Sequence, residues 1–190
     1  LELSSSIRQM EDDPRVALWF TQNQVFEDLK AVPFPYGLNF FTLKELHKSV
    51  KNLRNAKKLD KPLIPLSRIH AHLNGDALRI RTELTPLMGP ALALEEYYLQ
   101  IKKHRFVVSP PGDRPDTHRH YECIALGAYP ISNLPSSFRQ IFEDNMLYSD
   151  NLVEAARGNF FRTKGSPKPD FVRTKFWRKF VQKKTYECIG

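Results

Sequence analysis

The sequence predicts an α/β domain with a Rossmann-like, mostly parallel sheet flanked by helices. Short apolar runs alternate with helically periodic segments, which is the pattern of strands joined by crossover helices. The 190 residues correspond to one domain, and a chain of this size buries about 70% of its extended surface. Hydrophobic residues make up 41% and charged residues 26%, which is typical of a folded protein and of neither a disordered chain nor a coiled coil.

The N-terminal part is expected to hold one strand, one irregular connection and one helix. The apolar run VALWF predicts a strand at residues 16–20. Residues 22–40 contain prolines and a glycine, which predict an irregular segment. Thr42 and Glu45 have the spacing of a capping box, which predicts a helix at 42–57.

The middle of the chain is expected to hold a strand followed by two helices. Residues 63–69 are a strand candidate that one proline weakens. Residues 75–84 are predicted to form a helix that carries Arg79 and Arg81. Residues 93–103 have helical spacing, with acidic residues early and lysines late, as the helix dipole favours.

The stretch SPPGDRPDTHRHYECIALGAYPI contains the clearest pattern. A buried strand is predicted at residues 106–109, and a Pro-Pro-Gly turn follows it. Asp116 or Thr117 then caps a helix that ends before Gly127, and a second strand is predicted at 129–132. This order is a βαβ unit whose loop lies at the carboxyl end of the first strand, the edge at which open α/β sheets bind ligands.

The C-terminal part is expected to be helical. Short helices are predicted at residues 136–142 and 151–157, and a basic helix at 171–186. The aromatic residues of the basic helix either pack on the domain while its lysines face solvent, or join the lysines in binding an anionic membrane or a nucleic acid. We favour the packing alternative.

The charge favours anionic partners, and the cysteines indicate no disulfide scaffold. A net charge of +8 and an isoelectric point near 9.5 suit nucleotide sugars, acidic glycans, anionic lipids and nucleic acids, and do not choose among them. Two cysteines are too few for a disulfide framework, and Cys123 lies in an apolar helical pattern. No run approaches the roughly 18 consecutive apolar residues that a membrane span requires.

The turn and the helix after it have the chemistry of an anion site. Gly112 allows the backbone to approach a ligand closely, and the first turn of the helix exposes unpaired N–H groups. Arg119 offers a planar set of donors for phosphate oxygens. Glu122 lies on the same helical face, where its carboxylate can accept the hydroxyls of a ribose. The alternative is that Arg119 and Glu122 form only a surface ion pair.

Further basic and histidine side chains are candidates near this turn. His118 is interpreted as a helix-mouth residue that lines the phosphate pocket, with packing or capping as the alternative. Arg79 either reaches the phosphates from a neighbouring loop or lies on the solvated surface. The histidine pairs at 70/72 and 118/120 do not have the spacing of a zinc site, so no metal site is expected.

The central motif resembles the donor-binding segment of exostosin-like glycosyltransferases, in which a strand ends in Ser-Pro-x-Gly and is followed by Asp-x-His-Arg-x-x-Glu, a leucine-glycine step and Pro-Ile. The residues at these positions are Ser109, Pro110, Gly112, Asp116, His118, Arg119, Glu122, Leu126, Gly127, Pro130 and Ile131. WFTQN, PFPYGL and EEYYLQIKKHRF precede the motif in the order that the family shows. The resemblance covers residues 15–145, and only the central motif is specific.

The resemblance implies the GT-B fold, in which two Rossmann-like halves enclose the active site and the C-terminal half binds the nucleotide sugar. It implies that Arg119 neutralises the diphosphate and that Glu122 orients the ribose of a UDP-sugar rather than a GDP-sugar, without a metal or another cofactor. The implied acceptor is a glycan or a glycoprotein. The implied location is the Golgi or the lumen of the secretory pathway, if the chain is a typical eukaryotic member. The expected donor-binding residues are Ser109, Gly112, Asp116, His118, Arg119, Glu122 and Arg79.

The expected organisation has three parts. Residues 1–38 correspond to a remnant of the acceptor half and the interdomain crossing, 39–160 to the nucleotide-sugar-binding domain, and 161–190 to the basic helix. A catalytic base is not identified, because the acceptor half that would supply it is incomplete; an upstream domain or a partner chain would complete the cleft. The alternatives are a non-catalytic nucleotide- or glycan-binding module and, less favoured, a basic nucleic-acid-binding domain.

Overall fold

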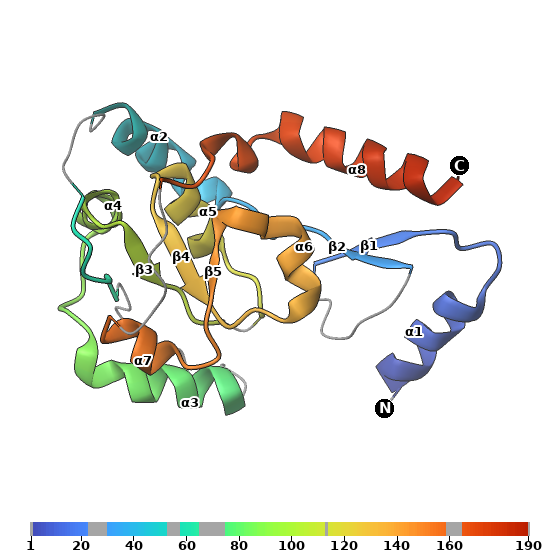
Figure 1. Ribbon diagram of the computed structural model, residues 1–190, viewed down its shortest axis with the longest axis horizontal. Coiled ribbons are helices and arrows are strands. Elements are labelled where there is room, and N and C mark those ends of the chain that lie inside the picture. The colour runs from blue at the N-terminus through green and yellow to red at the C-terminus, as the bar shows by residue number, and fades with distance from the viewer. Residues whose placement is uncertain are drawn as a thin grey trace.

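The computed structural model describes residues 2–22, 30–52, 58–64, 75–112, 114–158 and 165–189 (Figure 1). The helices are α1 (Glu2–Asp12), α2 (Leu43–Asn52), α3 (Gly75–Leu84), α4 (Leu94–Lys103), α5 (His118–Ala125), α6 (Arg139–Phe142), α7 (Leu152–Ala156) and α8 (Thr174–Ile189). The strands are β1 (Trp19–Thr21), β2 (Ala31–Pro33), β3 (Phe106–Val108), β4 (Tyr129–Ser132) and β5 (Leu147–Tyr148).

The main sheet is parallel and has the order β3-β4-β5. Val108 lies opposite Ile131, and Ile131 lies opposite Leu147. Leu59 and Leu63 form parallel bridges to His104 and to Val107, so the segment 59–63 runs along the outer edge of β3. The predicted βαβ unit is therefore present as β3, α5 and β4.

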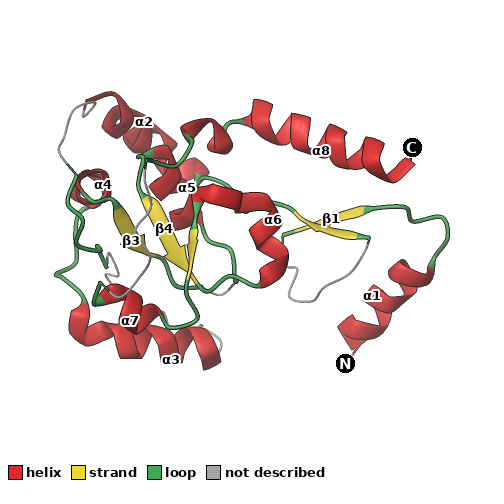
Figure 2. Cartoon of the chain, viewed as in Figure 1, coloured by secondary structure: helices red, strands yellow, loops and turns green. Residues whose placement is uncertain are grey.

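Helices cover both faces of this sheet, as Figure 2 shows. Phe106, Val108 and Ile131 pack against α3 and α7 on one face. Val107 points to the opposite face, where it packs with residues of α2, α4 and α5. The alternation follows from the period of two residues in a strand, which sends neighbouring side chains to opposite faces. The result is a three-layer α/β arrangement, which agrees with the predicted fold class at this level.

Pro130 lies inside β4, where a proline would ordinarily remove a ladder hydrogen bond. Its neighbours satisfy the pairing with β3, because Tyr129 N donates to Arg105 O at 2.8 Å and Ser109 N donates to Ile131 O at 2.8 Å. The pairing of β4 with β5 begins only at Ile131. The position of Pro130 is thus compatible with a strand that has neighbours on both sides.

A two-stranded parallel sheet of β1 and β2 extends to one side of this body, with α1 beyond it (Figure 1). The sequence predicted a strand at 16–20, and the structure places it at Trp19–Thr21. The expectation that residues 22–40 are irregular throughout is wrong, because Ala31 and Val32 form the buried strand β2. Helix α1 was not predicted.

The start of α2 agrees with the prediction to within one residue, and a turn that was not predicted precedes it. A 3-10 turn at Phe40–Thr42 precedes the helix, and the Asn39 side chain accepts a hydrogen bond from Phe41 N at 3.0 Å. Asn39 therefore caps this turn, and α2 itself begins at Leu43, directly after Thr42 and within one residue of the predicted start. Residues 53–57 of the predicted helix, and 65–69 of the predicted strand, lie outside the described residues.

Helix α8 runs beside β1 and β2 (Figure 1). Trp177 on α8 is buried against Phe34, Phe171 and Phe180. At the far end of the helix, the Cys188 thiol donates to Ala17 O at 3.0 Å. The aromatic side of the basic helix therefore packs on the protein, as we favoured from the sequence. Among the described helices, none has the length and apolar character needed to cross a membrane.

Candidate functional site

Helix α5 positions the candidate site. Thr117 is its extended N-cap residue, and Gly127 has a φ of +72°, a left-handed conformation that glycine adopts without strain. Both features agree with the sequence prediction. Ala128 N donates to Cys123 O at 2.8 Å, which ends the helix and turns the chain into β4. At the other end of the helix, His120 Nε2 lies 3.3 Å from the carbonyl oxygen of Ser109, so the first turn of α5 lies at the carboxyl end of β3.

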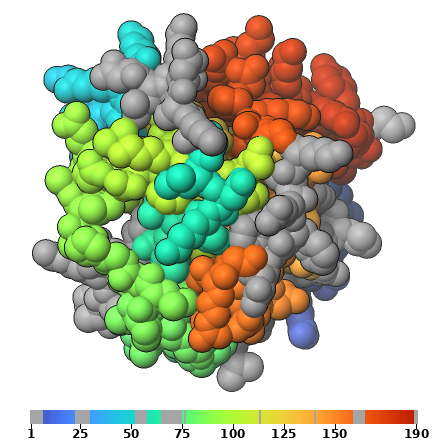
Figure 3. Space-filling view, turned by 60° about the vertical axis from the view of Figure 1, so that its left-hand side comes forward, coloured from blue at the N-terminus to red at the C-terminus, as the bar shows by residue number. Residues whose placement is uncertain are grey.

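A pocket of about 930 Å³ lies beside α4 and α5. Its described lining comes from the segment 61–64, the loop 87–94, the inner side of α4, and the end of α7. Figure 3 shows residues 58–64, in teal, between α4 and α7 on this side of the molecule. Arg119 and Glu122 both line the pocket, so the two residues that the sequence placed on one helical face do share one cavity.

A tyrosine hydroxyl joins these two side chains. Arg119 Nε donates to Tyr97 Oη at 3.3 Å, and Tyr97 Oη donates to Glu122 Oε2 at 2.9 Å. Tyr98 Oη donates to the other oxygen, Glu122 Oε1, at 3.1 Å. The predicted alternative of a simple Arg119–Glu122 surface ion pair is therefore not observed, since Glu122 is buried and its two oxygens accept tyrosine hydroxyls.

Burial and neighbouring groups shift the pKa values of Tyr97 and Arg119. Burial raises the pKa of Tyr97 well above its usual value, and the Glu122 charge raises it further although Arg119 opposes this. Burial acts against the charge of Arg119 and is the largest single influence on its pKa, but Tyr97, Cys123 and Glu122 together oppose it, so the pKa of Arg119 is raised. At neutral pH the group is therefore a cationic guanidinium beside a neutral phenol. Each oxygen of Glu122 retains a lone pair that can accept another hydroxyl.

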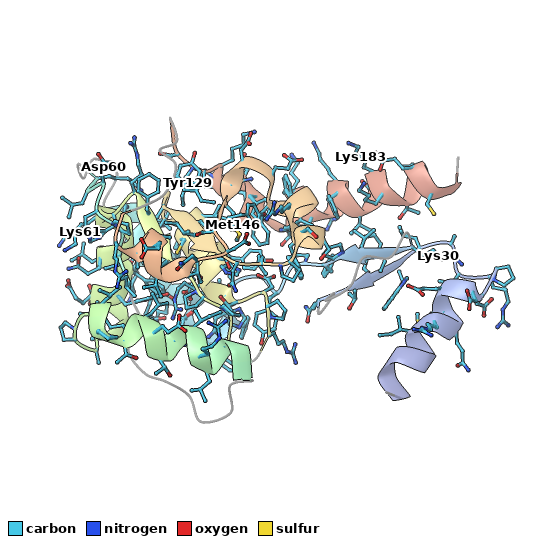
Figure 4. The ribbon with its side chains drawn as sticks, turned by 60° about the horizontal axis from the view of Figure 1, so that its bottom comes forward. Lys30, Asp60, Lys61, Tyr129, Met146 and Lys183 are labelled. Carbon is cyan, nitrogen blue, oxygen red and sulfur yellow. The ribbon has the colours of Figure 1, made fainter. Side chains whose placement is uncertain are left out.

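The charged lining of the pocket is mostly cationic. Lys61, Arg119 and Arg157 contribute positive charges, whereas Glu122 is the one acid in the described lining. Figure 4 shows Lys61 on the part of the molecule that lies far from Lys183 of α8. The remaining lining is largely apolar, from the loop 87–94 and the segment 62–64. Such a mixture suits a ligand that carries both anionic groups and an apolar ring.

Asp116 lies in the interior and contacts other parts of the chain. Its Oδ2 accepts hydrogen bonds from Tyr36 N at 2.8 Å and from the Tyr121 hydroxyl, and its Oδ1 pairs with His120 Nδ1 at 2.8 Å. The carboxylate is 1% exposed and is not in the described lining of the pocket. Asp116 thus holds residue 36 against α5, and it has the geometry of a positioning residue rather than that of a ligand contact.

His118, like Asp116, contacts the segment that precedes α2. Its Nδ1 lies 2.7 Å from Gly37 O, and its ring packs at 4.3 Å from the ring of Tyr36. His118 therefore packs against residues 36 and 37, which is the alternative given above to a role in lining the phosphate pocket. Together with Asp116, His118 fastens the proline-rich segment before α2 to the mouth of α5.

Ser109 and Gly112 lie near the turn and outside the described lining of the pocket. Ser109 is fully buried, and its hydroxyl has no hydrogen-bond partner within the described part of the chain. A Cβ built on Gly112 would lie 3.6 Å from Thr117 Cγ2 and 3.8 Å from Arg81 Nη2, which are ordinary contacts. The protein itself does not require a glycine here, and the expected close approach of a ligand remains a prediction.

The two arginines of α3 differ in their exposure to solvent and in their partners. Arg79 is exposed and pairs with Glu83 at 3.0 Å, outside the described lining of the pocket, which matches the surface alternative. Arg81 is buried, and its Nε donates to Pro111 O at 3.0 Å. Arg81 therefore supports the Pro-Pro-Gly turn. The sequence did not identify this role, because side-chain partners thirty residues apart leave no periodic signal.

At the carboxyl end of α5, the ammonium of Lys58 contacts the carbonyl oxygens of Leu126 and Gly127. Burial lowers the pKa of Lys58 to about 8. In the unfolded chain the pKa returns to roughly 10.4, so between these values the unfolded state binds a proton that the folded state lacks. The stability of the wild type relative to Lys58→Met should therefore rise as pH increases from about 8 to about 10.4.

Chemical denaturation of both proteins across this pH range measures the effect. The difference in unfolding free energy between wild type and Lys58→Met should be constant below pH 8, with a positive slope above it. A difference that does not change with pH would show that the folded state leaves the pKa of Lys58 near its usual value.

Within the described residues, no group of three or more histidine, cysteine or acidic side chains is arranged to hold a metal ion. His70 and His72, one of the two histidine pairs in the sequence, lie outside the described residues. Cys123 is buried, and burial raises the pKa of its thiol, so this cysteine is a neutral core residue.

No protein-family model matches the chain. No curated protein matches it either.

Proposed function

We propose that this chain binds a nucleoside diphosphate sugar and is the donor-binding part of an exostosin-like glycosyltransferase of the GT-B type. The observation that carries the proposal is the presence of Arg119 and Glu122 in one pocket, with the Tyr97 hydroxyl between them. These are the two residues to which the resemblance assigns the diphosphate and the ribose. The favoured donor is a UDP-sugar, and the acceptor class is a glycan or a glycoprotein.

The chemistry of the pocket supports this assignment. A guanidinium fixed by a tyrosine presents its remaining N–H groups to phosphate oxygens without reorganising. In glycosyl transfer the bond between the anomeric carbon and the diphosphate oxygen breaks, and negative charge builds on the departing diphosphate. Arg119, with Lys61 and Arg157 in the same lining, would stabilise that charge. In this proposal these cations take the place of a metal ion.

The size of the pocket also suits such a ligand. Its volume of about 930 Å³ is within the range of about 300 to 1,000 Å³ that small-molecule sites occupy. Glu122 is held on the cavity side of α5 by Tyr97 and Tyr98 from α4. A carboxylate fixed in this way can accept two hydroxyls of a sugar with little loss of side-chain entropy.

Titration with UDP, GDP and uridine, followed by calorimetry and by thermal unfolding, tests the proposal. We expect UDP at millimolar concentration to raise the melting temperature, because a ligand that binds only the folded state stabilises it. Uridine should bind more weakly than UDP, since it lacks the phosphates that Arg119 would contact. An unchanged melting temperature with all three ligands would contradict donor binding.

A further measurement separates an enzyme from a binding module. Transfer or hydrolysis of a UDP-sugar by the chain would support a transferase, whereas UDP binding without turnover would support the non-catalytic module. Binding of RNA or DNA with steep salt dependence, and no UDP binding, would instead support the nucleic-acid alternative.

A further inference from the structure

Two adjacent phenylalanine side chains just before α2 are almost fully exposed to solvent. Phe40 is 80% exposed and Phe41 is 90% exposed. The two rings contact each other edge to face, with centroids 6.0 Å apart. Aromatic side chains usually lose most of their exposed area on folding, so an adjacent pair that stays in solvent is a candidate contact surface.

The backbone holds this pair in place. The 3-10 turn at Phe40–Thr42 leads directly into α2, and the Asn39 side chain accepts a hydrogen bond from Phe41 N at 3.0 Å. Thr42 Oγ1 donates to Asn39 O at 3.3 Å. The two rings are thus presented by a capped turn at the end of a helix rather than by an unstructured loop.

Helix α2 continues this surface with positive charge. Its inner side is formed by the buried residues Leu46 and Ser49. Its outer side holds three exposed lysines, which recur every three or four residues and therefore lie in one row. These are Lys44, Lys48 and Lys51. In Figure 3, α2 lies in cyan at the upper left margin of the molecule.

The distribution of the other side chains on α2 reinforces the pattern. Leu43 and Val50 are more than a third exposed and lie between the lysine row and the buried side of the helix. The acid of this helix, Glu45, is only half exposed, and its charge acts on Tyr98 of α4, so it lies toward the protein. The lysine row of α2 is therefore bordered by partly exposed apolar side chains on one edge and by the partly buried Glu45 on the other.

We propose that the Phe40–Phe41 turn and the lysine row of α2 bind the surface of an anionic lipid bilayer. The two rings would enter the interfacial layer, and the three lysines would contact the lipid headgroups, as in interfacial amphipathic helices. A lipid surface fits better than a nucleic acid, because the edge-to-face rings offer no flat platform for successive bases. This inference goes beyond the proposed function and does not require it.

The turn that carries Phe40 and Phe41 lies at the rim of the pocket. Asn39 and Thr42, the residues on either side of the phenylalanine pair, both line the 930 Å³ pocket. Binding through Phe40 and Phe41 would bring this rim of the pocket to the lipid surface. A ligand in the pocket would then lie close to acceptors that are anchored in the same bilayer.

Flotation with vesicles tests the proposal in the absence of any nucleotide. We expect the chain to bind vesicles of phosphatidylcholine and phosphatidylserine, and to bind pure phosphatidylcholine vesicles at least about tenfold more weakly. The double variant Phe40→Ser, Phe41→Ser should reduce binding to the anionic vesicles about tenfold or more. The variant Phe40→Trp, Phe41→Trp should retain binding, because tryptophan is favoured at the membrane interface.

A charge-matched pair of variants separates this surface from the general basicity of the protein. Lys44→Gln, Lys48→Gln, Lys51→Gln removes three charges from α2, and Lys175→Gln, Lys179→Gln, Lys183→Gln removes three exposed charges from α8. The first should weaken binding to anionic vesicles about tenfold or more and the second much less. Equal losses for the two sets, unchanged binding of the serine variant, or binding of oligonucleotides but not vesicles would each overturn the proposal.

Discussion

Replacing Arg119 with alanine should weaken the binding of UDP by about tenfold to a hundredfold. The guanidinium lines the pocket, and its Nε is held by the Tyr97 hydroxyl. Hydrogen bonds between charged partners contribute about 1.5–3 kcal/mol, which corresponds to this range. The free energy of unfolding without ligand should change far less than the affinity, because Arg119 is half-buried and forms no ion pair within the described part of the chain. Calorimetric titration of the variant with UDP measures the change.

Arg79→Ala is the matched control for this experiment. Arg79 was also a candidate from the sequence, but the structure places it on the exposed side of α3 in a pair with Glu83. Its removal should leave UDP affinity unchanged within about twofold, since exposed ion pairs contribute little. If Arg79→Ala weakens UDP binding and Arg119→Ala does not, the ligand lies outside the pocket described above.

Replacing Asp116 with alanine should destabilise the fold by about 3–5 kcal/mol. The carboxylate is 1% exposed, and its loss would remove the acceptor of the Tyr121 hydroxyl and the partner of His120 Nδ1, and would leave Tyr36 N with only its longer hydrogen bond of 3.2 Å to Tyr121 Oη. Buried polar groups that lose their partner keep the desolvation cost without the compensating bond. Chemical denaturation of the wild type and the variant measures the difference.

Asp170→Ala is the control for the stability measurement. Asp170 is exposed and pairs with Arg173 at 3.1 Å, so its removal should change the free energy of unfolding by less than about 0.5 kcal/mol. The opposite result for Asp116, a stable variant with greatly reduced UDP affinity, would make this carboxylate a direct contact of the donor. The experiment therefore distinguishes the positioning role from the role that the resemblance implied.

The local features of the central segment could be predicted from the sequence. The strand at Phe106–Val108, the start of α5 after Thr117, the left-handed Gly127 and the strand at Tyr129–Ser132 all agree with the prediction. These features depend on neighbouring residues, because capping, glycine conformation and strand patterning act over a few positions.

Other elements could not be predicted because distant contacts form them. β2 forms in a proline-containing segment because Ala31 and Val32 pair with β1 and become buried. The capping of the turn before α2 by Asn39 competes with the capping box at Thr42, and the sequence does not decide between the two. The segment 59–63 joins the sheet edge through isolated bridges to His104 and Val107, and most of the strand expected at 63–69 lies outside the described residues.

The sequence by itself determined which side chains share one face of α5, since helical spacing alone places Arg119 and Glu122 together. Only the tertiary structure decided which of the candidates face the cavity. Asp116 and His118 are bound by residues 36 and 37, some eighty positions earlier in the chain, whereas Tyr97 from α4 joins Arg119 to Glu122. The physical reason is that hydrogen bonds of buried polar groups must be satisfied wherever the fold supplies a partner, and that partner has no fixed distance along the sequence.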